Sequence, residues 1–252
     1  MAIKARNRWI HSSIFSVLAA FSFHAMADTS GPISTAGITG SYDQYKLKSN
    51  LGSQNGHLPK AGVFYNYGNK MTGGEGLIYQ AGVKAKFGEK HSNRLKEGRG
   101  QADLGWRMAI DNQNYVDALV GAGYDWSRYE PDTSGNDLRL TAKGPFAKAA
   151  LGYNHAFDNN TTLRLEGGVR RQLNERARLH VQHEGSESVD IHDRTNPYAE
   201  MDMLFNQNGK GLPITAGLYY EHHKDKLKDR LALADNVKLK HDEYGAKVGV
   251  AF

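Results

Sequence analysis

The chain has 252 residues, 39% of them hydrophobic, a formal net charge of +5 and no cysteine. Without cysteine it has neither a disulfide framework nor a lipid-modified N-terminal cysteine. Because Lys4, Arg6 and Arg8 lie in a predicted export signal, the mature chain carries a net charge of about +2, which does not indicate nucleic-acid binding.

Residues 1–27 have the pattern of a cleaved signal peptide. The basic start is followed by a short apolar segment, 14–23, and by Ala25-Met26-Ala27, which is an A-x-A cleavage site. We predict cleavage before Asp28 and a single domain over residues 28–252. The apolar segment is too short to cross a bilayer as a helix, so a retained anchor is the weaker alternative.

Ten segments of alternating polarity follow, each about long enough to cross a bilayer as a tilted strand. They lie at 35–46, 60–68, 76–88, 100–111, 115–128, 145–156, 161–173, 197–206, 213–223 and 241–252. In the fourth segment, Ala102 and Leu104 lie on one face, whereas Asp103 and Arg107 lie on the other. A soluble sandwich would show the same alternation, so this pattern alone leaves both folds open.

The connections between these segments are alternately short and long. The short ones are 69–75, 112–114, 157–160 and 207–212, and the long ones are 47–59, 89–99, 129–144, 174–196 and 224–240. We therefore predict an all-β transmembrane antiparallel barrel of about ten strands, with short periplasmic turns and long extracellular loops. Residues 178–184 either extend a hairpin above the membrane or add strands, which would give twelve.

Aromatic residues fall near the ends of the expected strands, as is typical of girdles at the two membrane surfaces. Those expected at the outer rim are Tyr42, Phe87, Trp126, Phe146, Tyr220 and Tyr244, and those expected at the periplasmic rim are Tyr67, Tyr79, Tyr115, Tyr153, Phe205 and Phe252. A general preference of aromatic residues for strands is the alternative explanation.

The last strand alternates up to a terminal aromatic residue, Phe252. With the cleavage site and the Gly-aromatic segment 120–124, this strand resembles the small outer-membrane β-barrel proteins of Gram-negative bacteria, the broad group of opacity, OmpX and OmpA-barrel-like proteins. The resemblance covers the mature chain and implies a place in the cell outer membrane, contact with its lipid and lipopolysaccharide, and insertion by the outer-membrane assembly machinery. The residues implied as the assembly signal are Tyr244, Val248, Val250 and Phe252. Members of the group include adhesins, serum-resistance factors, small porins and enzymes, so the fold leaves the function open.

Fourteen charged residues fall on the face expected to line the barrel interior. They are Lys84, Lys86, Asp103, Arg107, Asp117, Asp125, Lys148, Arg164, Glu166, Arg170, Glu200, Asp202, Glu221 and Lys247. In a narrow barrel side chains fill the interior, so charges of both signs would pair as a structural plug. The alternative is a small pore lined by the same groups, which twelve strands would favour.

Basic residues are frequent in two of the expected extracellular loops. They are Lys90, Arg94, Lys96, Arg99, Lys224, Lys226, Lys228, Arg230, Lys238 and Lys240. Such loops could bind the phosphates of lipopolysaccharide or an acidic surface ligand. Simple solvation of charged loops is the alternative.

Histidine residues raise the question of metal, haem or catalytic chemistry. His180, His183, His192, His222 and His223 lie in or near long loops, but no spacing matches a recognised zinc site, and we predict no cofactor.

Neighbours in a strand point to opposite faces, so His192-Asp193 and His241-Asp242 do not by themselves form a catalytic pair. The expected strand count resembles the omptin proteases, but their paired acids and His-Asp arrangement have no match at corresponding positions.

Three functions therefore remain from the sequence. The favoured one is a non-enzymatic surface barrel whose loops bind an external partner, and the alternatives are a narrow porin and an outer-membrane hydrolase. A soluble secreted barrel that binds haem is a more remote fourth.

Overall fold

The computed structural model describes residues 31–49, 52–90, 93–130, 138–158, 160–181, 185–191, 193–207, 211–226 and 238–252. The predicted signal peptide, 1–27, lies outside them. The strands are β1 (Ile33–Ser49), β2 (Gly52–Gly68), β3 (Gly76–Lys90), β4 (Asn93–Ala109), β5 (Asn114–Glu130), β6 (Leu138–Asp158), β7 (Thr161–Gln172), β8 (Arg176–Val181), β9 (Gly185–Asp190), β10 (Arg194–Phe205), β11 (Ile214–Lys226) and β12 (Lys238–Ala251). Among the described residues, no helix is long and apolar enough to cross a membrane.

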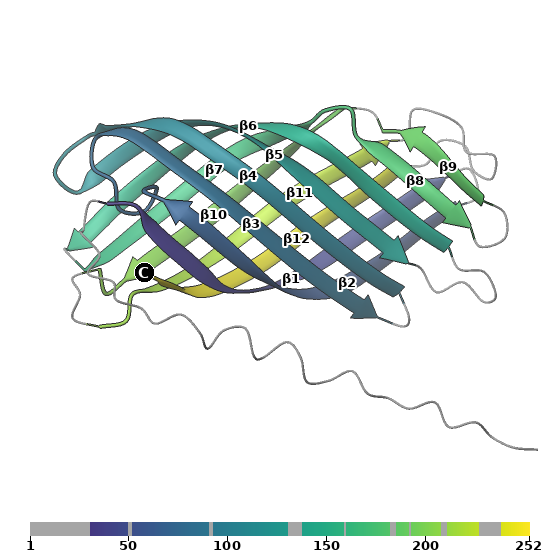
Figure 1. The fold of residues 1–252 in the computed structure, drawn as a ribbon, viewed down its shortest axis with the longest axis horizontal. Coiled ribbons are helices and arrows are strands. Elements are labelled where there is room, and N and C mark those ends of the chain that lie inside the picture. The colour runs from purple at the N-terminus through teal and green to yellow at the C-terminus, as the bar shows by residue number, and fades with distance from the viewer. Residues whose placement is uncertain are drawn as a thin grey trace, which may run out of the picture.

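Ten strands form a closed antiparallel barrel (Figure 1). The strands β1 to β7 pair in chain order, β7 pairs with β10, and β12 pairs with both β11 and β1. At the closure, Ser34 and Phe252 exchange two backbone hydrogen bonds of 2.8 Å. The prediction of ten barrel strands is therefore confirmed.

The strands β8 and β9 form a hairpin outside the barrel wall (Figure 1). Leu138–Lys143 of β6 pairs with β8, whereas the pairing of β6 with β7 begins only at Phe146. Beyond the end of β7, β8 of the hairpin thus pairs with the same edge of β6. Of the two alternatives for residues 178–184, the hairpin is correct and the twelve-stranded barrel is wrong.

The strands continue through much of the region expected to be long loops. β1 ends only at Ser49 and β2 begins at Gly52, while β3 ends at Lys90 and β4 begins at Asn93. Strands of 17 residues, tilted by about 40°, rise about 40 Å, which exceeds an apolar band of about 25 Å. This end of the barrel, which we call the hairpin end, therefore projects beyond the membrane.

The opposite end holds both ends of the barrel chain and the short turns, and we call it the turn end (Figure 1). In one turn the Asp111 carboxylate accepts hydrogen bonds from the backbone N–H groups of Gln113 and Asn114, at 2.8 Å each. These bonds, with one from the Asn114 side chain, lower the pKa of Asp111. The side chain of Asp111, at the start of the turn, thus holds the backbone of the turn in place.

The barrel wall is apolar outside and polar inside. Leu104, Trp106, Val120 and Leu151 are among the exposed apolar residues of the outer wall. Phe146 departs from the expectation that it belongs to the outer girdle, because it shares the inward face of β6 with Lys148 and is 2% exposed. Its ring passes over Gly123, where a Cβ atom would lie 2.4 Å from the Phe146 Cζ.

Candidate functional site in the barrel interior

The interior holds a network of ion pairs that contains all fourteen charged residues expected there. Six further residues that the sequence did not place in the interior belong to the same ion pairs. They are Asp43, Lys60, Lys70, Glu97, Arg99 and Glu243. The set thus contains ten cations and ten anions, so its formal charge is balanced.

Arg107 anchors the network at the turn end. Its guanidinium donates to both carboxylate oxygens of Asp117, at 2.7 and 2.9 Å, and is 2% exposed. The same group donates to the carbonyls of Lys70, at 2.6 Å, and Gly73. Because both carbonyls belong to the turn between β2 and β3, Arg107 holds that turn across the barrel opening. Arg164 donates to Oδ2 of Asp117, which also accepts from Arg107, and at 2.8 Å to Glu166.

Lys70 enters the interior from that turn. Its Nζ lies 2.6 Å from Glu166 and 3.2 Å from Asp103. Lys148 contacts the same two carboxylates, at 2.8 and 2.7 Å. The hydroxyl of Tyr198 also donates to Glu166, at 2.7 Å. Lys70 was not predicted to face the interior, because a turn residue has no strand alternation to show which way its side chain points.

Lys247 of the last strand forms a separate cluster. Its Nζ lies 2.9 Å from Glu200 and 3.0 Å from Asp202, both on β10. All three were predicted interior residues.

Glu221 is the centre of the middle cluster. It accepts contacts from Arg99 at 2.8 Å, Lys84 at 3.0 Å and Arg170 at 3.1 Å. Arg99 also contacts Asp125 at 2.5 Å. Arg99 was expected in an extracellular basic loop, and that expectation is wrong. β4 already begins at Asn93, so Arg99 takes the inward face together with Asp103 and Arg107.

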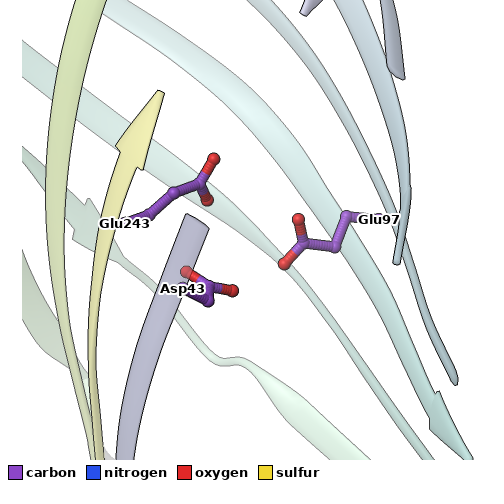
Figure 2. Close-up of side chains that lie close together, drawn as sticks. All are labelled: Asp43, Glu97 and Glu243. Carbon is purple, nitrogen blue, oxygen red and sulfur yellow. The ribbon is translucent and has the colours of Figure 1, made fainter. Parts of the chain in front are cut away.

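Three carboxylates converge near the hairpin end, from β1, β4 and β12. They belong to Asp43, Glu97 and Glu243, which point toward one another across the interior (Figure 2). The Nζ of Lys60 lies 2.7 to 2.8 Å from all three, and Lys86 contacts both Glu97, at 3.1 Å, and Glu243. We call these five residues the outer cluster. The Lys60 ammonium stands where a metal ion shared by the three carboxylates would have to bind.

Two histidines lie beside the outer cluster. The rings of His223 and His241 stack with centroids 4.2 Å apart. His241 Nδ1 lies 3.5 Å from Asp43, and His223 lies 3.3 Å from Glu221. As expected for neighbours on a strand, Asp242 faces outward, away from His241. His183 and His192 lie outside the described residues.

The clusters leave a small cavity between them. It has a volume of about 100 Å³ and is lined by Thr39, Phe64, Gln101, Tyr219 and charged groups of the network. A volume of this size holds only a few water molecules.

The predicted basic residues at the hairpin end lie mostly on strands. Lys90 ends β3, while Arg94 and Lys96 begin β4, and Arg94 contacts Glu89 at 3.4 Å. Lys224 and Lys240 are exposed on β11 and β12. Lys226 and Lys238 belong to strands, but their side chains are not among those that the structure describes. Lys228 and Arg230 lie outside the described residues.

The residues implied as an assembly signal lie on the closing strand or directly after it. Tyr244 and Val248 are exposed on the outer face of β12, which Val250 shares. Phe252 follows the end of β12 and bonds to Ser34.

Comparison with known proteins gives one family. The model of the outer membrane protein beta-barrel domain matches residues 13–186. A comparison with curated proteins gives no match.

Among solved structures, the chain is similar to the outer membrane protease OmpT from Escherichia coli, with 7% identity, a TM-score of 0.52, and coverage of 91% of this chain and 99% of OmpT. The translocator domain of the autotransporter NalP from Neisseria meningitidis gives 14% identity, a TM-score of 0.39, and coverage of 86% and 88%. OprG from Pseudomonas aeruginosa gives 9% identity, a TM-score of 0.35, and coverage of 89% and 97%. At such low identity the likeness to OmpT concerns the fold alone. The closed barrel and the family match together place the chain in the outer membrane, and it belongs to the family of outer membrane proteins with a β-barrel domain.

Proposed function

We propose that this protein is a non-enzymatic, non-conducting outer-membrane barrel that presents its hairpin end to an external partner. The barrel serves as a rigid support, and the strands that project beyond the membrane form the binding surface. Charge on the projecting strands, such as that of the exposed Lys96, favours an acidic partner.

The charge-balanced interior network is the observation that carries this proposal. An aqueous pore keeps charged side chains hydrated, whereas here Lys60, Asp103 and Asp117 have no exposed side-chain area. An ion that entered would have to break contacts such as those of Arg107 with Asp117, because buried pairs become costly once one partner is lost. The size of the cavity supports the same conclusion, since about 100 Å³ holds only a few water molecules.

A hydrolase has less support from the geometry. The carboxylates nearest to His223 and His241 are Glu221 and Asp43, and both already contact lysine or arginine. A carboxylate held by cations is a poor base for activating water.

Single-channel conductance of the refolded mature protein in a planar bilayer tests the proposal. Gel mobility with and without boiling shows that the barrel has formed, and a general porin in the same bilayer is the positive control. We expect a folded barrel without discrete openings. Steady openings of one size would contradict the proposal and favour the narrow porin.

A further inference from the structure

Three lysines lie side by side on the outer wall of the barrel, near the hairpin end. Lys46 of β1 is directly opposite Lys240 of β12, and Lys240 is directly opposite Lys224 of β11. All three side chains are exposed, and they share the outward face with Tyr42 and Tyr244. We call these three residues the lysine row.

The lysine row has no acidic partner among the residues that the structure describes. The next outward-facing row contains Asp242, but its carboxylate accepts a hydrogen bond from Tyr220, at 2.6 Å, and lies 2.8 Å from His222 Nδ1. Like charges directly opposite each other on a sheet repel and destabilise it. Three adjacent lysines therefore favour an anion from outside the chain.

The height of the row indicates where that anion comes from. Tyr42, Tyr244 and Tyr220 form a row of their own on the same three strands, and the last two rings lie 5.1 Å apart. Exposed aromatic rows mark the membrane surface in barrels of this kind. The lysine row is four residues farther along each strand, which is about 10 Å higher for a tilted strand, and lysine side chains can reach back toward the surface.

We propose that the lysine row binds the phosphate groups of lipopolysaccharide in the outer leaflet. Neighbouring strands are about 4.8 Å apart, so three ammonium groups fall within about 10 Å and can contact the phosphorylated headgroup of one molecule. This site lies on the membrane-facing wall, so it is separate from the partner surface proposed above and would hold the barrel at a fixed depth.

The test compares two charge-matched variants. Lys46→Gln with Lys240→Gln removes two members of the row, while Lys143→Gln with Arg171→Gln removes two exposed outward charges from β6 and β7. Each variant is refolded into phosphatidylcholine vesicles, alone, with lipopolysaccharide, or with lipopolysaccharide whose phosphates have been removed. The first readout is the melting temperature, taken as the temperature at which half of the protein loses the gel mobility of the folded, unboiled barrel. The second readout is the affinity for lipopolysaccharide.

We expect intact lipopolysaccharide, and not the dephosphorylated form, to raise the melting temperature of the wild type and of the control variant. The row variant should lose most of this rise and bind about fivefold more weakly for each lysine removed. In phosphatidylcholine alone it should be at least as stable as the wild type, because repulsion is relieved. An equal rise in the row variant, or an equal loss in the control variant, would overturn the proposal. Neither outcome affects the conductance experiment, so the two proposals fail independently.

Discussion

Lys60 connects three strands through one ammonium group. Its carboxylate partners come from β1, β4 and β12, and its side chain has no exposed area. Removing one partner of a buried ion pair is costly, because the remaining charges keep their desolvation penalty without compensation. In the outer cluster this penalty would fall on three carboxylates, with Lys86 left as the one cation of the five.

Lys60→Met should therefore destabilise the barrel by about 3 to 5 kcal/mol. Urea unfolding in lipid vesicles, followed by tryptophan fluorescence, measures the change. Lys96→Met is the matched control, since Lys96 is exposed on the outer wall, and its effect should stay within about 0.5 kcal/mol. If the two variants unfold at the same urea concentration, the Lys60 contacts do not stabilise the protein.

Adding Glu97→Gln to Lys60→Met should recover part of the loss. The double variant returns the outer cluster to the net charge that it has in the wild type, so the two effects should not add. Strict additivity would show that the Lys60–Glu97 contact carries no coupling.

Alternation along strands was sufficient to place all fourteen predicted charges in the interior. It could not assign their partners, because partners such as Lys84 and Glu221 are far apart in the chain and meet only through barrel closure and register. Asp43 and Lys60 were missed because they lie near the edges of predicted strands. Arg99 was misplaced for a related reason, since the predicted strand began one residue after it.

At the scale of elements, the main discrepancy concerns the length of the strands. Residues 52–58 read Gly-Ser-Gln-Asn-Gly-His-Leu, a composition that suggests a loop, yet they continue β2. Above the membrane the outer face of a strand contacts water instead of lipid, so the outward residues need not be apolar and the alternation that identifies strands disappears. Pairing of backbone groups with β1 still continues to Gly52.

Glycine lets β11 and β12 pack closely in the interior. The Tyr219 ring lies over Gly245, where a Cβ atom would be 2.1 Å from Tyr219 Cζ. From this position the Tyr219 hydroxyl donates to Glu243 at 2.9 Å and lies 3.2 Å from Thr39 Oγ1. The contact between Tyr219 and Gly245 therefore positions the Tyr219 hydroxyl beside the outer cluster.

Gly245→Ala should destabilise the barrel by about 1 to 3 kcal/mol, because the Tyr219 ring must move and its hydrogen bonds with it. Gly167→Ala is the control, since nothing lies within 4 Å of a Cβ atom there, and it should be nearly neutral. Urea unfolding of both variants decides the question. Equal stability would mean that the ring relocates without cost, and rescue of Gly245→Ala by Tyr219→Ala would identify the ring as the cause.

On the scale of the whole molecule, closure of the barrel depends on ten strands and leaves the β8–β9 hairpin outside the ring. The hairpin pairs only with the outer part of β6, among the described residues. Its ends are directly opposite each other, because Arg176 pairs with Asp190. A two-residue turn can therefore replace it.

Replacing residues 177–189 with Asn-Gly should leave the barrel closed. The shortened protein should keep the mobility difference between boiled and unboiled samples and remain silent in a planar bilayer. Any loss of binding to an external partner would then come from the hairpin itself. Loss of the mobility difference would show, on the contrary, that the hairpin belongs to the barrel wall.

Charge balance in the interior also bears on how the chain is assembled. The last strand supplies Glu243 to Lys60 and Lys86, and it supplies Lys247 to Glu200 and Asp202. Before β12 docks, Glu200 and Asp202 lack Lys247, whereas Lys60 and Lys86 share only the carboxylates of Asp43 and Glu97 within the outer cluster. Docking of β12 against β1 completes the backbone ring and forms the ion pairs of Glu243 and Lys247 at the same time. A barrel without β12 would therefore leave Glu200 and Asp202 without Lys247, and the cost of unpaired buried carboxylates would disfavour that incomplete state.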